Sequence, residues 1–146
     1  MIRKATLDDI PAIADLGERF FRQSHYAQFA TWDRVSFAET LAVLVRAGTL
    51  LVVQHECVVG MGAFLLFPWY FNASQHGAQE IFLFIAPDHR GRDGFRLIEE
   101  MERAAKEAGA VAFIAGSTEG MRHEALDRLY LRRGYAPAGN TFIKRF

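Results

Sequence analysis

The sequence predicts one α/β domain, built from a mixed sheet with helices on both faces. Three observations lead to this prediction. Apolar residues recur at helical spacing in four stretches, two β-rich runs follow each other in the middle of the chain, and the second half alternates strands with helices. The 146 residues suffice for one substantial core, and no repeat, low-complexity tract or linker interrupts them. We therefore expect a single domain over residues 1–146.

The N-terminal part is predicted to form a strand and a helix. Residues 2–6 have the pattern of a short strand. A helix follows, with Thr6 or Asp8 as its N-cap; Pro11 fits the first turn of a helix and favours Asp8. Its apolar stripe consists of Ile10, Ile13, Ala14, Gly17, Phe20 and Phe21.

A second helix and a hairpin are predicted next. The helix spans 34–47, with one apolar face and Gly48 as its stop. The β-rich runs 49–54 and 57–67 are separated only by His55 and Glu56, which indicates a hairpin. This link contains neither Asn-Gly nor Asp-Gly, so the turn itself adds little to the prediction.

The second half is predicted to alternate strands and helices. Residues 68–77, aromatic at first and then polar, are predicted to be a loop, and 79–85 are apolar enough for a central strand. The remaining elements are a helix over 95–108 stopped by Gly109, a buried strand over 110–115, a helix over 122–133 stopped by Gly134, and a last strand over 141–144.

Composition argues against several classes of protein. Basic and acidic residues number 17 each, so no strong overall field attracts nucleic acid or a membrane surface. The single cysteine, Cys57, rules out a disulfide framework and a thiolate metal cluster, and the histidines show no metal-ligand spacing. The N-terminus lacks an apolar signal region, and no apolar run approaches a membrane span. We expect a cytoplasmic protein without a metal, a nucleic-acid partner or a membrane partner.

The segment between the strand 79–85 and the next helix has the features of an anion-binding turn. It contains Arg90, Gly91, Arg92 and Gly94. The first N–H groups of a helix are unpaired and lie at the positive end of its dipole, and a glycine-bearing turn can fold them around a phosphate. Arginines add charge-assisted hydrogen bonds. The segment predicts a pyrophosphate site; the alternative is an ordinary solvated turn.

Three motifs, in order and at fitting spacing, are shared with a known family. They are the opening segment 2–10, the strand end and turn over 85–91, and Leu-Tyr-Leu-Arg-Arg-Gly-Tyr over 129–135. Over nearly its whole length the chain resembles the GCN5-related N-acetyltransferase (GNAT) superfamily. It also resembles, more loosely, small acetyltransferase-like proteins of phage and prophage genomes. The resemblance implies a largely antiparallel, V-splayed sheet of about six to seven strands, and acetyl-CoA as co-substrate.

The resemblance also implies which residues contact the coenzyme. The main chain of Phe84, Ile85 and Ala86 would run beside the pantetheine arm, where one N–H polarises the acetyl carbonyl. His123, near the start of the last helix, would either contact the coenzyme or be an exposed first-turn residue. The pyrophosphate would lie against the turn and the helix start, formed by Arg90, Gly91, Arg92, Asp93, Gly94 and Phe95.

The turn departs from the family pattern. The family runs Arg-Gly-x-Gly-x-Gly/Ala, whereas this chain is one residue shorter; Gly94 takes the last small position, and the middle glycine is either lost or replaced by Asp93. A carboxylate beside a pyrophosphate is unfavourable unless it turns to solvent or pairs with Arg92 or Arg96. This departure predicts weaker coenzyme binding.

Two residues are candidates for proton transfer. The resemblance implies that Tyr130 donates to the departing thiolate; the alternative is a core aromatic residue with a satisfied hydroxyl. Glu80 is a lone carboxylate beside an apolar strand. Partial burial would raise its pKa and suit it as the general base, whereas the structural interpretation is a strand-end residue facing water.

The expected function is transfer of an acetyl group from acetyl-CoA to a primary amine of a small molecule or peptide. Two alternatives remain: a GNAT-like domain that binds CoA without turnover, and a protein-interaction domain that uses exposed aromatic residues around 69–71. The acceptor is not identified, although 22–34 and 68–77 are the segments expected to select it. Dimers are common in the resembled family, so a homodimer is possible and the oligomeric state stays open.

Overall fold

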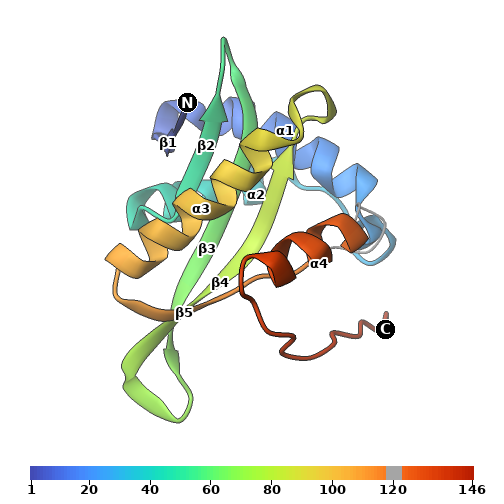
Figure 1. Cartoon of the computed structure of the whole chain (residues 1–146). Helices are drawn as coiled ribbons and strands as arrows, with labels where there is room; N and C mark the ends of the chain where they lie inside the picture. The colour runs from blue at the N-terminus through green and yellow to red at the C-terminus, as the bar shows by residue number, and fades with distance from the viewer. Residues whose placement is uncertain (118–122) are drawn as a thin grey trace.

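The computed structural model describes residues 1–117 and 123–146. One mixed sheet lies at the centre of the fold (Figure 1). The strand order is β1-β2-β3-β4-β5; the first three pairings are antiparallel, and β4 and β5 are parallel. The prediction of a mixed, largely antiparallel sheet is confirmed. The strands are β1 (Ile2–Lys4), β2 (Leu50–Gln54), β3 (Val58–Trp69), β4 (Asn72–Ile85) and β5 (Ala110–Ile114).

Helices lie on both faces of the sheet, as predicted. Because side chains alternate along a strand, Val52 of β2 packs with α1 and α2, whereas Val53 packs with α3. Gly62 of β3 lets α3 approach closely, since a Cβ there would lie 2.5 Å from Sδ of Met101. The helices are α1 (Ile10–Gln23), α2 (Arg34–Ala47), α3 (Arg92–Glu107) and α4 (His123–Arg132), with 3-10 turns η1 (Leu7–Asp9), η2 (His25–Gln28) and η3 (Pro87–His89).

The boundaries of the first two helices follow local chemistry. The predicted range of α2 is confirmed: the Asp33 carboxylate accepts from the Ser36 N–H at 2.9 Å, and Gly48 ends the helix with a φ of 71°. Pro11 lies in the first turn of α1, as expected. Of the two predicted caps, Thr6 is the N-cap of η1, which leads directly into α1, whereas the preference for Asp8 is wrong, because Asp8 lies inside η1 and Asp9 precedes α1.

The segment 68–77 is not a loop. β3 runs to Trp69, the chain turns at 70–71, and β4 begins at Asn72. Aromatic packing explains the error: Phe67 pairs with Gly77, and its ring lies 2.7 Å from where a Gly77 Cβ would be, so the ring covers the glycine across the hairpin. Tyr70 and Phe71 are left exposed at the turn.

The predicted strand over 110–115 forms, but it is an edge strand and not a buried one. Val111 is 58% exposed. The last strand, predicted over 141–144, is absent; this segment has no regular secondary structure, and Phe142 is 89% exposed. A strand needs a neighbour to accept its backbone hydrogen bonds, and 141–144 pair with none of the described strands. The described part of the sheet therefore has five strands where about six to seven were expected.

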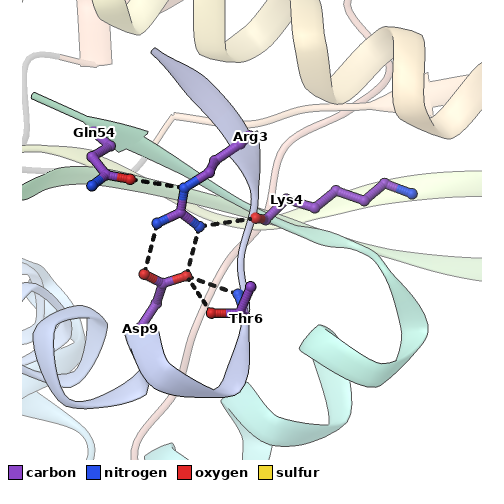
Figure 2. Close-up of polar contacts among 5 residues, drawn as sticks. All are labelled: Arg3, Lys4, Thr6, Asp9 and Gln54. Atoms are coloured by element: carbon purple, nitrogen blue, oxygen red, sulfur yellow. Dashed lines mark hydrogen bonds and ion pairs between the residues drawn. The ribbon is translucent and has the colours of Figure 1, made fainter.

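A polar cluster joins β1 to the start of α1 (Figure 2). The Asp9 carboxylate accepts two hydrogen bonds from the Arg3 guanidinium, at 2.7 and 2.8 Å, and a third from the Thr6 N–H at 2.8 Å. Nε of Arg3 also donates to Oε1 of Gln54 on β2. The hydrogen bond from Arg3 is the main cause that lowers the pKa of Asp9, from 3.8 to about 2.

Asp9→Asn is expected to lower the free energy of unfolding by about 2 kcal/mol at pH 7, because a folded-state pKa below the unfolded one stabilises the ionised form. This contribution is fully present well above 3.8, the pKa of the unfolded state, and is lost as the pH falls through about 2. The free energies of unfolding of the two proteins should therefore converge in strong acid. Urea unfolding at both ends of this range measures it. Asp15→Asn, which breaks an exposed pair with Arg34, should cost at most about 0.5 kcal/mol. Equal losses in both variants would contradict the assignment.

Candidate active site

Strands β4 and β5 separate partway along the sheet. Their parallel pairing runs from His76 to Gln79 of β4 and ends at Ile114 of β5. Beyond this point β4 continues to Ile85 paired only with β3 among the described strands, and Figure 1 shows it leading to the start of α3 while β5 turns toward α4. Glu80 is the first residue of β4 after the last pair with β5. The two strands therefore open at Glu80.

Glu80 and Tyr130 meet at this opening. The Tyr130 hydroxyl, from α4, donates to Oε2 of Glu80 at 2.8 Å, and Tyr130 is only 6% exposed. Burial raises the pKa of Glu80 from 4.5 to about 7, against the opposing effect of the hydrogen bond. Burial and the nearby Glu80 charge raise the pKa of Tyr130 far above its usual value. At neutral pH the site therefore combines the Tyr130 phenol, which stays protonated, with the Glu80 carboxyl group, which can gain or lose a proton.

A second polar cluster holds Tyr130 against α3. The Tyr135 ring lies 5.0 Å from the Tyr130 ring, and its hydroxyl donates to Oε1 of Glu102 at 2.8 Å. Arg133 also donates to Glu102, and its guanidinium lies 4.9 Å from the centre of the Phe95 ring. Sequence reasoning missed this cluster. The available signal was Tyr135 itself, because its hydroxyl gives the end of the 129–135 motif a polar group, which here donates to Glu102.

The main chain at the end of β4 presents polar groups to the opening. The Ala86 N–H donates to the Val59 carbonyl of β3 at 2.8 Å. Because successive residues of a strand direct their backbone groups to opposite edges, those of Ile85 point away from β3. Nε of Arg90 confirms this direction, since it donates to the Ile85 carbonyl at 3.2 Å. Phe84, two residues before Ala86, directs its backbone groups toward β3 as Ala86 does, so Ile85 is the residue of this run whose main chain faces the opening.

The turn before α3 has room for an anion. Gly91 has a φ of 114°, and a Cβ built on it would meet no atom within 4 Å. Arg92, Asp93 and Gly94 form the first turn of α3, where backbone N–H groups have no helical acceptor. Arg92 is exposed beside this turn. Free space, open N–H groups and arginine charge together fit a phosphate or a pyrophosphate.

Asp93 does not follow either expectation for its side chain. Its carboxylate faces Nε2 of His55 at 2.7 Å, not solvent, Arg92 or Arg96. His55 lies in the turn between β2 and β3, far away in the sequence, so no spacing rule could have predicted this pair. The structure describes His123 only as the first residue of α4. The predicted contact of its side chain with the coenzyme lies outside what the structure describes.

Neither a metal site nor a membrane span is found over residues 1–117 and 123–146. No group of three or more His, Cys, Asp or Glu side chains in these ranges could hold a metal ion. No helix in the same ranges has the length and apolar character needed to cross a bilayer.

Comparison with known proteins gives one consistent result. The sequence model of the "Acetyltransferase (GNAT) family" matches residues 11–135, which is most of the chain. No curated protein sequence gives a match.

Solved structures agree over nearly the full length. A GCN5-related N-acetyltransferase from Ralstonia eutropha JMP134 is 19% identical, with a TM-score of 0.71, and covers 99% of this chain and 97% of that chain. Glucosamine-6-phosphate N-acetyltransferase from Arabidopsis thaliana is 14% identical, with a TM-score of 0.76 and coverage of 100% and 97%. Ribosomal-protein-alanine N-acetyltransferase from Brucella melitensis is 24% identical, with a TM-score of 0.75 and coverage of 95% and 86%. Identities this low show a shared fold.

Proposed function

The chain belongs to the acetyltransferase (GNAT) family, and on this basis we propose that it transfers the acetyl group of acetyl-CoA to a primary amine of a small molecule or a peptide. The observation that carries the proposal is the 2.8 Å hydrogen bond between Tyr130 and Glu80 at the opening between β4 and β5. It brings a proton donor and a candidate base, from distant parts of the chain, to one point on the edge that leads to the α3 turn.

The residues of this edge fit acetyl-CoA as the co-substrate. Space above Gly91 and the first N–H groups of α3 suit the pyrophosphate, with Arg90 and Arg92 supplying positive charge. The main-chain groups of Ile85, which face away from β3, suit the amide-bearing pantetheine arm. Acetyl-CoA itself supplies the activated thioester, whose aminolysis requires mainly positioning and proton handling.

Each group has one role in the transfer. Glu80 accepts a proton from the neutral amine as it attacks the thioester carbonyl, and the Ile85 N–H donates to the carbonyl oxygen as negative charge develops. Tyr130 gives its proton to the departing thiolate. Because Tyr130 is hydrogen-bonded to Glu80, the proton that Glu80 gained can pass to the Tyr130 oxygen. Both side chains then return to their starting protonation states.

The test is thiol release from acetyl-CoA as a function of pH, for the wild type and for Tyr130→Phe. We expect kcat/KM of the wild type to fall below about pH 7, because Glu80 must be ionised to act as a base. Tyr130→Phe should lower kcat by about 10²-fold. It should also move the pH at which kcat/KM begins to fall to a higher value, since it removes the hydrogen bond that lowers the pKa of Glu80. Acceptors to test are glucosamine 6-phosphate, an aminoglycoside and a peptide beginning with alanine.

Arg103→Gln is the control, because Arg103 lies on an exposed surface of α3, where it pairs with Glu100 and Glu107. It should match the wild type in rate and pH profile. If Tyr130→Phe changes neither the rate nor the pH at which kcat/KM falls, the proposed role of Tyr130 is wrong. Thermal stabilisation by CoA, without thiol release for any acceptor, would instead favour a CoA-binding domain without turnover.

A further inference from the structure

Asp93 creates a difficulty for the proposed coenzyme site. It is the second residue of α3, and a carboxylate in the first turn of a helix is attracted to the open N–H groups there. These are the same groups that would bind the pyrophosphate. An Asp93 side chain turned toward them would compete with the coenzyme and repel it.

His55 holds the Asp93 carboxylate elsewhere. Nε2 of His55 lies 2.7 Å from Oδ2 of Asp93, and the Asp93 side chain is 22% exposed in this pair. The imidazole comes from the turn between β2 and β3, so it approaches the start of α3 from a separate part of the chain.

The same imidazole also contacts the other side of the turn. Its ring centre lies 5.0 Å from that of His89, the last residue of η3. His89 and Asp93 bracket the segment Arg90, Gly91 and Arg92. One side chain therefore contacts the chain both before and after the anion-binding turn.

From this geometry we infer that His55 is a positioning residue of the coenzyme site, which holds Asp93 off the start of α3 and leaves the N–H groups there to the pyrophosphate. The inference depends on the proposed use of acetyl-CoA. It explains how a chain with Asp93 in the first turn of α3 keeps an open anion site. On this account, His55 matters for coenzyme binding only because Asp93 is charged.

The test is a double-mutant cycle on the dissociation constant of CoA, measured by calorimetry. His55→Ala should weaken binding about tenfold, the size expected for one uncompensated charge a few ångströms from the ligand. Asp93→Asn should bind CoA at least as tightly as the wild type, because it removes the carboxylate that His55 holds away. The double variant H55A/D93N should also recover affinity to within about threefold, because it has no carboxylate left to be held away.

A second readout separates positioning from a general loss of structure. S-acetylpantetheine lacks the pyrophosphate, so its turnover should be the same in His55→Ala and the wild type, whereas the KM for acetyl-CoA should rise at constant kcat. Glu56→Ala, which changes the exposed neighbour of His55 in the same turn, is the control and should change neither.

The outcomes are distinct. If the wild type does not bind CoA, the proposed function itself fails. If the wild type binds CoA and His55→Ala binds it equally well, the inference is wrong. It is also wrong if the double variant stays as weak as His55→Ala, or if S-acetylpantetheine turnover falls in parallel with CoA affinity.

Discussion

Glu80→Gln is expected to lower kcat/KM for acetyl transfer by about 10²- to 10⁴-fold, the usual contribution of a general base. The change is nearly isosteric, and the amide oxygen can still accept the Tyr130 hydrogen bond seen at 2.8 Å, so the fold should persist. The amide cannot take a proton from the amine. The fall in rate below about pH 7 should therefore disappear along with most of the rate. Initial rates of thiol release, measured from well below to well above this pH, record both effects.

The matched control for this prediction is Glu107→Gln, at the far end of α3, where the carboxylate pairs with Arg103 on an exposed surface. It should leave both the rate and the pH profile unchanged. CoA affinity should be the same in all three proteins, because Glu80 contacts none of the residues assigned to the pyrophosphate. A Glu80→Gln enzyme with wild-type kcat/KM would show that the base is another group or water.

The architecture was predictable where the signal is local. Capping and stop residues set α2 in full, because Asp33 and Gly48 act on neighbouring backbone groups. Alternating or continuous apolar runs likewise predicted the strands on either side of His55. Tyr130 and Glu80 were singled out separately, one from a motif and one as a lone carboxylate beside an apolar strand. Their hydrogen bond across 50 residues required the structure.

The errors have a common physical origin. The hairpin over 68–77 depends on the Phe67 ring covering Gly77, and the absent strand over 141–144 depends on a neighbouring strand to pair with. The Asp93 partner depends on where the turn after β2 is placed. Each of these outcomes is decided by a contact between residues that are not neighbours in the sequence, and turn propensity or apolar pattern carries no information about it.

The second large effect is expected at Gly91, where Gly91→Ala should raise the dissociation constant of CoA by about 5- to 150-fold. Its φ of 114° is a conformation that residues with a Cβ rarely adopt, and holding one there costs about 1–3 kcal/mol. The alanine methyl meets no atom within 4 Å, so strain in the backbone, and not a clash within the protein, drives the change. The turn can relax to relieve this strain, but binding the pyrophosphate would require the strained form again. Calorimetric titration with CoA measures the loss.

Gly109→Ala separates this effect from a general cost of strain. Gly109 follows the other end of α3, has a φ of 93°, and likewise has no atom within 4 Å of the position that an alanine methyl would take. Both variants should lower the thermal unfolding midpoint, because both force a side chain into a backbone conformation that favours glycine. Only Gly91→Ala should weaken CoA binding, since only Gly91 lies in the turn assigned to the pyrophosphate. Equal CoA affinities for the two variants would place the coenzyme away from the start of α3.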